Sequence, residues 1–136
     1  MGFRPGMSAA DLEARVSALG GKWSCNTSRV DKRFAECRGH VTNAGAEYTL
    51  TGSLVAGTSA VLLIGGEVDD AELGRWVEDL STKYGRVTAR LANTQAMWQW
   101  VRDRRMIRVT TRIERGNRVV SVSLVDGITL DSLGGG

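Results

Sequence analysis

Apolar residues recur every three or four positions in two short segments, and each segment is bounded by residues that start and end helices. The first lies between Ser8 and Gly20, and the second lies between Asp69 and Gly85. Ser and Asp side chains accept the free backbone N–H groups at a helix start, and glycine favours a helix end. The pattern therefore predicts two amphipathic helices. Their apolar stripes are Leu12, Val16 and Leu19 in the first and Leu73, Trp76, Val77 and Leu80 in the second.

After each predicted helix the apolar period changes to two, which is typical of half-buried strands. Each half of the chain is thus predicted to be one helix followed by a four-stranded antiparallel meander. The strands are expected near residues 24–28, 35–41, 47–53 and 59–64 in the first half, and near 87–91, 97–102, 106–114 and 119–125 in the second.

The two halves also align with each other at an offset of 61 residues. Residues 8–66 match residues 69–127 without a gap, and twelve of the 59 pairs are identical, against about four expected from ordinary composition. A unit of this size has one helix to cover one face of its sheet. We therefore predict an α+β protein of two tandem helix-plus-four-strand repeats, 6–66 and 68–131. Their strands are expected to form one antiparallel sheet with both helices on one face.

Composition excludes several kinds of active site. The 136 residues include one histidine and two cysteines, too few for a site with two imidazoles or four thiolates. We find no catalytic motif, and we expect neither enzymatic activity nor a bound metal or cofactor. The net charge is +3, but seven arginines lie between residues 102 and 118. Such a stretch can meet phosphates, acidic protein surfaces or anionic lipid headgroups, or form a solvated strand edge.

Cys25 and Cys37 flank a polar stretch that can turn the chain back on itself. Their spacing is compatible with a disulfide in an oxidising compartment and with two buried thiols in a reducing one. The N-terminal residues lack the apolar core of a signal peptide, and no apolar run is long enough for a membrane-spanning helix. If the cysteines are bridged, we expect the mature form of a periplasmic or secreted protein.

The strongest candidate for a binding surface is the hairpin that contains Trp98 and Trp100. A three-residue turn would place Trp100 opposite Arg108 and Trp98 opposite Thr110. With Arg112, these side chains would line the sheet face away from the helices, because the alternate positions carry the better apolar set. Tryptophan and arginine often dominate protein interfaces. A register error of one residue would reverse the faces and bury both tryptophans.

Three short motifs stand together in the first 40 residues. Pro5-Gly6-Met7-Ser8 opens a short helix ended by glycine, Cys25 follows, and Cys37-Arg38-Gly39-His40 comes next. Together they resemble the first repeat of the β-lactamase inhibitory protein family, and the opening alone more distantly resembles the small outer-membrane assembly lipoproteins. The second half of the chain lacks both a cysteine pair and the Gly-Met opening.

The resemblance to the inhibitory family implies a secreted tandem repeat with a disulfide that binds a protein on a concave sheet face. It also implies an acidic residue on the hairpin of the first repeat that enters the target enzyme. Glu47, beside Tyr48, is the nearest match to that residue in this chain.

These observations favour a non-catalytic, exported module that binds a protein partner through an open sheet face. It would act as an inhibitor or as an extrinsic accessory subunit of a larger assembly, such as a membrane-bound one. The rival is a protein that binds nucleic acid or another polyanion through the arginines between residues 102 and 118, with the tryptophans as stacking platforms. Steep weakening of binding by salt would distinguish the rival.

Overall fold

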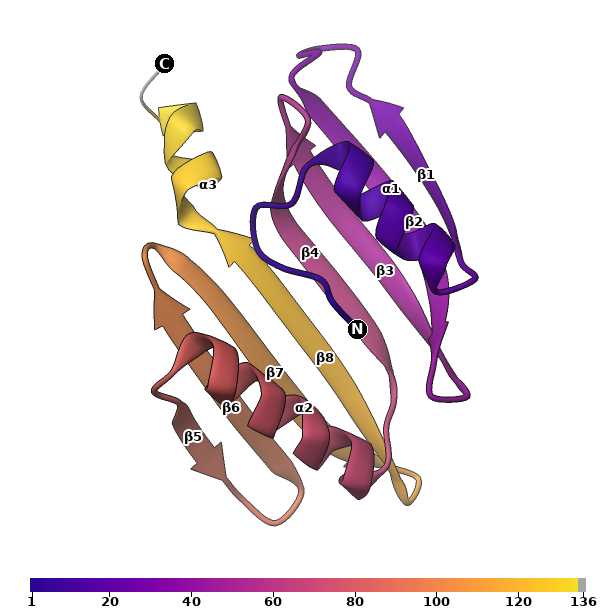
Figure 1. The fold of residues 1–136 in the computed structure, drawn as a ribbon, viewed down its shortest axis with the longest axis vertical. Coiled ribbons are helices and arrows are strands. Elements are labelled where there is room, and N and C mark those ends of the chain that lie inside the picture. The colour runs from indigo at the N-terminus through magenta and orange to yellow at the C-terminus, as the bar shows by residue number, and fades with distance from the viewer. Residues whose placement is uncertain (135–136) are drawn as a thin grey trace.

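The structure is a computed structural model that describes residues 1–134 as one eight-stranded antiparallel sheet and three helices (Figure 1). In chain order the elements are α1 Ala9–Ala18, β1 Lys22–Thr27, β2 Phe34–Asn43, β3 Ala46–Val55, β4 Thr58–Glu67, α2 Asp70–Tyr84, β5 Thr88–Leu91, β6 Gln95–Arg102, β7 Arg105–Glu114, β8 Asn117–Asp126 and α3 Gly127–Gly134. The strands lie in the order β1-β2-β3-β4-β8-β7-β6-β5, so the last strands of the two halves pair at the centre. Figure 1 shows α1 and α2 on the same face of the sheet.

Both long helices begin as the capping pattern predicts. The Ser8 hydroxyl accepts the backbone N–H of Asp11 at 3.1 Å, and the Asp69 carboxylate accepts that of Glu72 at 2.7 Å. All eight predicted strands are present, with ends that differ by a few residues. The sequence pattern did not indicate α3, whose first turn is capped by the buried carboxylate of Asp126.

Four tight turns join strands within the two meanders, and in each turn both central residues have positive φ. The pairs are Ala44-Gly45, Ala56-Gly57, Asp103-Arg104 and Arg115-Gly116. Two-residue turns of this kind match the right-handed twist of the strands that they connect. Three of them carry glycine at the second position, which adopts this conformation without strain. Asp103-Arg104 has no glycine, so it lacks the sequence signal of such a turn.

The predicted register of the β6–β7 hairpin is therefore wrong by one residue. The turn contains Asp103 and Arg104 alone, so Trp100 pairs with Ile107 and Trp98 with Val109 instead of Arg108 and Thr110. This shift moves both tryptophans to the face that packs under α2. Trp100 is 1% exposed, and its indole N–H donates to the Ser81 hydroxyl of α2 at 3.3 Å.

The gap-free alignment of the two halves also fails in the central strands. It equates Leu63 with Leu124, yet Leu63 lies on the face away from the helices and is 42% exposed, whereas Leu124 is buried beneath them. A β-bulge between Ser53 and Leu54 adds one residue to the β3–β4 hairpin. An extra residue reverses the side chains that follow it. The strand order is compatible with two helix-plus-four-strand units, but the offset of 61 does not hold along the chain.

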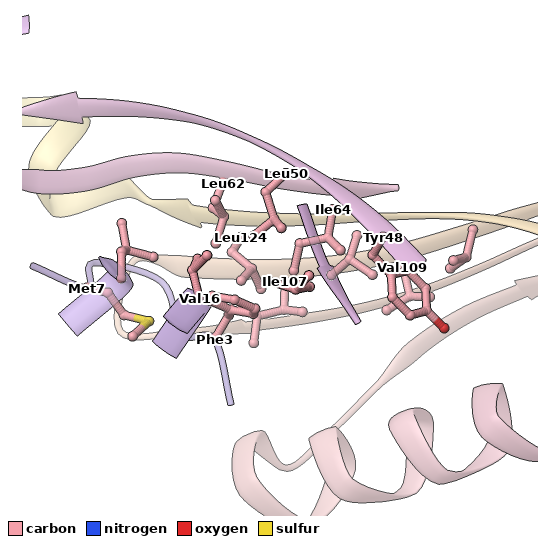
Figure 2. Close-up of a cluster of buried hydrophobic side chains, with 14 of the residues drawn as sticks. Phe3, Met7, Val16, Tyr48, Leu50, Leu62, Ile64, Ile107, Val109 and Leu124 are labelled. Atoms are coloured by element: carbon pink, nitrogen blue, oxygen red, sulfur yellow. The ribbon is translucent and has the colours of Figure 1, made fainter. Parts of the chain in front are cut away.

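The core lies between the sheet and the helices, and the N-terminal segment contributes Phe3 and Met7 to it (Figure 2). Two aromatic rings in this layer stand over glycines on neighbouring strands. Tyr48 is paired with Gly66, where a Cβ would lie 2.7 Å from the ring, and Trp23 is paired with Gly39, where the corresponding distance is 2.9 Å. Only glycine leaves room for a ring lying flat across the strand at these positions.

The sheet also brings the two cysteines together. Cys25 on β1 pairs directly with Cys37 on β2, and the side chains form a disulfide. The bridge closes the polar loop that connects the two strands and ties the edge strand β1 to its neighbour. The disulfide expected from the sequence is thus present, and the alternative of two free thiols is excluded for this structure.

Replacement of Trp100 by alanine is expected to lower the free energy of unfolding by about 3–5 kcal/mol, because it leaves a large cavity under α2. The neighbouring Val101 is 64% exposed on the other face, so Val101→Ala serves as the matched control and is expected to change stability by less than about 0.5 kcal/mol. Urea unfolding followed by tryptophan fluorescence and circular dichroism measures both. Equal losses in the two variants would contradict the observed register.

Removal of the disulfide by Cys25→Ala together with Cys37→Ala is expected to lower the free energy of unfolding by about 2–3 kcal/mol, since a short loop is no longer closed in the unfolded chain. A reducing agent is expected to bring the wild-type protein down to the same stability and to leave the double variant unchanged. Thermal unfolding with and without reductant checks this, and a reductant-insensitive wild type would contradict it.

Candidate functional site

The candidate site is the sheet face away from the helices, here called the open face. Side chains alternate between the two faces of a strand, so the strand pairing defines continuous rows across this face. One row joins all eight strands, and the apolar Leu63 lies at its centre. From β1 to β5 this row consists of Ser24, Arg38, Thr51, Leu63, Ser123, Arg108, Gln99 and Thr88.

At its centre the open face combines the aliphatic Val61, Leu63 and Val125 with small hydroxyl residues, and it is basic on the side of β5 to β7. The hydroxyl residues Thr49 on β3 and Ser121 on β8 lie on either side of Gly65 on β4. A groove of about 710 Å³ lies over β5, β6 and β7. Its walls include Arg90, Met97, Gln99, Arg108, Thr110 and Arg112.

Contacts within the groove hold two of its arginines in place. The Arg108 guanidinium donates to the Gln99 side-chain oxygen at 2.8 Å, and that of Arg112 pairs with Glu114 at 2.6 Å. Within residues 1–134, neither Arg90 nor Arg108 has a carboxylate oxygen within 4.0 Å. Guanidinium groups of this kind can pair with a carboxylate or a phosphate.

The structure places three of the predicted binding residues together and separates the others. Arg108, Thr110 and Arg112 lie on the open face and line the groove, as expected. Trp100 is buried on the opposite face, and Trp98 is half-buried there, so the predicted Trp/Arg-lined surface is wrong in its aromatic half. The groove residues Arg90, Met97 and Gln99 were missed because they become neighbours of Arg108 and Thr110 only in the correct register.

Glu47 and Tyr48, the pair suggested by the resemblance, lie on different faces. Glu47 is exposed at the start of β3, and β4 and β8 separate its strand from the arginine groove. Tyr48 is 1% exposed and packs against Trp76 of α2, with ring centroids 5.5 Å apart. Burial, and then the carboxylates of Glu72 and Asp69, raise the pKa of the Tyr48 phenol. Tyr48 is therefore a core residue at the contact between β3 and α2.

Glu72 connects this contact between β3 and α2 to the β2–β3 hairpin. Its carboxylate accepts hydrogen bonds from the Trp76 indole at 2.9 Å, the Arg75 guanidinium at 3.0 Å and the Asn43 amide at 3.4 Å. The bond from Arg75, helped by those from Trp76 and Asn43, outweighs burial and lowers the pKa of Glu72. The N-terminus of α2 is thus attached to the first meander through one ionised side chain.

Searches for known relatives identify no family for this chain. No family model, curated protein or solved structure matches it. Residues 1–134 contain no cluster of three or more His, Cys, Asp or Glu side chains that could hold a metal ion. Among the same residues, no helix is both long and apolar enough to cross a membrane. The functional argument therefore rests on the open face itself.

Glu72→Gln is expected to lower stability at neutral pH by about 1–3 kcal/mol, because the ionised acceptor of three hydrogen bonds is lost. The pKa of Glu72 is lower in the folded protein than in the unfolded chain, so its stabilisation is complete above the ordinary glutamate value of 4.5. The stabilisation is lost as the pH falls through the lower folded pKa.

The gap in stability between wild type and Glu72→Gln is thus expected to shrink between pH 6 and pH 3. Urea unfolding at several pH values measures it, with the exposed Glu78→Gln on the same helix as control. A gap that does not change over this range would contradict the pKa argument.

Proposed function

We propose that the protein is a non-catalytic module that binds another protein on its open face. The observation that carries the proposal is the asymmetry of the sheet. Both long helices and the N-terminal segment cover one face, while within residues 1–134 no helix covers the other (Figure 1). A broad, rigid, twisted sheet with one uncovered face offers a preorganised surface, so that binding costs little conformational entropy.

The chemistry of the open face suits an acidic protein surface. Arg90 and Arg108 have no acidic partner among residues 1–134, and Arg112 lies beside them. The open face also carries apolar area, namely Leu63, which is 42% exposed, Met97, and a row across four neighbouring strands made of Val61, Val125, Met106 and Val101. A mixture of arginine, hydroxyl and aliphatic groups is typical of reversible protein interfaces. This composition makes arginine, rather than tryptophan, the expected centre of the binding energy.

The disulfide supports an exported location, periplasmic or secreted, because such bridges persist in oxidising compartments.

We further propose that the two halves are tandem copies of one helix-plus-four-strand unit, for which the strand order is the supporting observation. In this proposal the protein acts as an inhibitor-like module or as an extrinsic accessory subunit. The resemblance in the first 40 residues supports the first form.

The rival proposal is the binding of a polyanion at the same arginines. Two features of the structure disfavour it. The tryptophans that would stack on bases lie on the other face, and Arg102, Arg104 and Arg105 each pair with an aspartate at the turn end of the hairpin.

Photo-cross-linking tests the open-face proposal. A benzophenone amino acid at position 63 is expected to form an adduct with a protein of the exported fraction, whereas the same group at Glu13, exposed on α1, is expected to form none. Excess unlabelled wild-type protein should compete for the adduct. Arg108→Ala should compete about tenfold more weakly, since interface arginines often contribute more than about 1.4 kcal/mol.

Two further measurements complete this test. Arg108→Ala is expected to unfold within about 0.5 kcal/mol of wild type, because the side chain is exposed. Single-stranded DNA labelled with a fluorophore is expected not to bind at low salt. Equal adducts at positions 63 and 13 would count against the open face, and DNA binding that weakens steeply with salt would support the polyanion rival.

A further inference from the structure

The edge strand β5 has one unpaired side, and its four residues are all exposed. The backbone N–H of Ala92 donates to the carbonyl of Gln95 at 2.9 Å and closes the β5–β6 hairpin. In an antiparallel pair, hydrogen-bonded and non-hydrogen-bonded positions alternate. The backbone groups of Arg90 and Thr88 therefore face β6. Those of Leu91 and Ala89 point outward, where they can pair with an added strand.

On the helix side, this edge is apolar and uncovered. Ala89 and Leu91 pair with Trp98 and Ala96 and share the face on which α2 lies. Leu91 is 72% exposed. A groove of about 510 Å³ separates the β5–β6 hairpin from α2, and Leu73, Val77 and Trp98 are among the side chains that line it.

On the open side, the same edge is basic. Thr88 and Arg90 point to this face, and the groove behind Arg90 contains Arg108 and Arg112. A strand added beside β5 would alternate its side chains between the two grooves, because successive residues point to opposite faces. Every second side chain would meet apolar surface, and the others would meet guanidinium groups.

We propose that an extended peptide with alternating apolar and acidic residues binds as a ninth strand along β5. Main-chain hydrogen bonds to Ala89 and Leu91 supply affinity, and the two grooves supply specificity. Charge complementarity selects this occupant over a second copy of the chain, since a copy paired edge to edge would bring the arginines at positions 86 and 90 of both chains together. The proposal concerns the edge and does not depend on a partner covering the open face.

Titration with synthetic peptides tests the proposal. The probe is an end-capped heptapeptide of alternating valine and glutamate, and the matched control replaces glutamate by lysine. The full-length protein is expected to bind the glutamate peptide at least about tenfold more tightly at low salt, because carboxylates pair with the arginines of the groove. By NMR, the amides of Ala89 and Leu91 are expected to exchange more slowly with solvent in the complex.

A pair of variants separates the main-chain contribution from folding. Ala89→Pro removes an outward N–H that β6 does not use, which edge strands tolerate, and it is expected to weaken binding about tenfold. Ala89→Thr keeps the N–H and is expected to bind within about twofold of wild type. A valine–glutamate peptide N-methylated on alternate amides tests the same hydrogen bonds without changing the protein. Its affinity for the wild-type protein is expected to be as low as the affinity of Ala89→Pro for the unmodified peptide.

Four outcomes would overturn the proposal. These are equal affinity for the two peptides, binding without protection of the Ala89 and Leu91 amides, tight binding of the N-methylated peptide, and dimerisation through β5 detected by light scattering. Peptide contacts at Leu63 and Ser121 in place of β5 would reject the edge while supporting the open face. Loss of cross-linking at position 63 with intact peptide binding would reject the open face and leave the edge proposal supported.

Discussion

Pairing between β4 and β8 is the interaction on which the rest of the structure depends. Seven residue pairs join the two meanders, and Leu62 opposite Leu124 and Ile64 opposite Val122 place four buried side chains at the centre of the core. Without this pairing, each half would expose a long inner edge and would have a single long helix to cover its apolar face. With this pairing, the two inner edges are joined, and the helices and the N-terminal segment cover a common core.

That common core determines what the open face can contain. The helix side takes the large rings, because burying them contributes most to stability: Trp100 and Tyr48 are the largest of the fully buried side chains. The open face is left with arginines, hydroxyl residues and a short row of aliphatic groups. Its expected mode of recognition is therefore charge-assisted hydrogen bonding by guanidinium groups around small apolar contacts, rather than insertion of aromatic side chains.

The open face and the β5 edge meet at Arg90, whose backbone belongs to the edge strand and whose side chain lines the groove. A partner that engages both would combine a folded surface with an extended segment. The two contacts have different physical signatures, since one depends on side-chain charge and the other on free backbone groups. At the opposite edge, the disulfide joins β1 to β2.

Much of the architecture could be predicted from local pattern. The caps Ser8 and Asp69, the two helices, the eight strands and the pairing of Cys25 with Cys37 depend on residues close in sequence, where periodicity and turn chemistry act directly. The sequence also placed Arg108, Thr110 and Arg112 on the open face, but it did not indicate the groove that they line. The short helix α3 was not predicted, because its cap at Asp126 is recognisable only once Arg105 and the end of β8 surround it.

The amino-acid sequence by itself thus determined the two long helices and the eight strands, because their patterns repeat within a few residues. Tertiary structure alone decided the register of the β6–β7 hairpin and therefore which face β6 buries. The turn at Asp103-Arg104 holds an arginine at positive φ where such turns usually carry glycine, and a bulge adds one residue near Ser53. Because side chains alternate along a strand, a change of one residue in the turn or in the bulge exchanges the buried and exposed faces of the strand that follows. Packing of Trp100 beneath α2 is what selects the observed register.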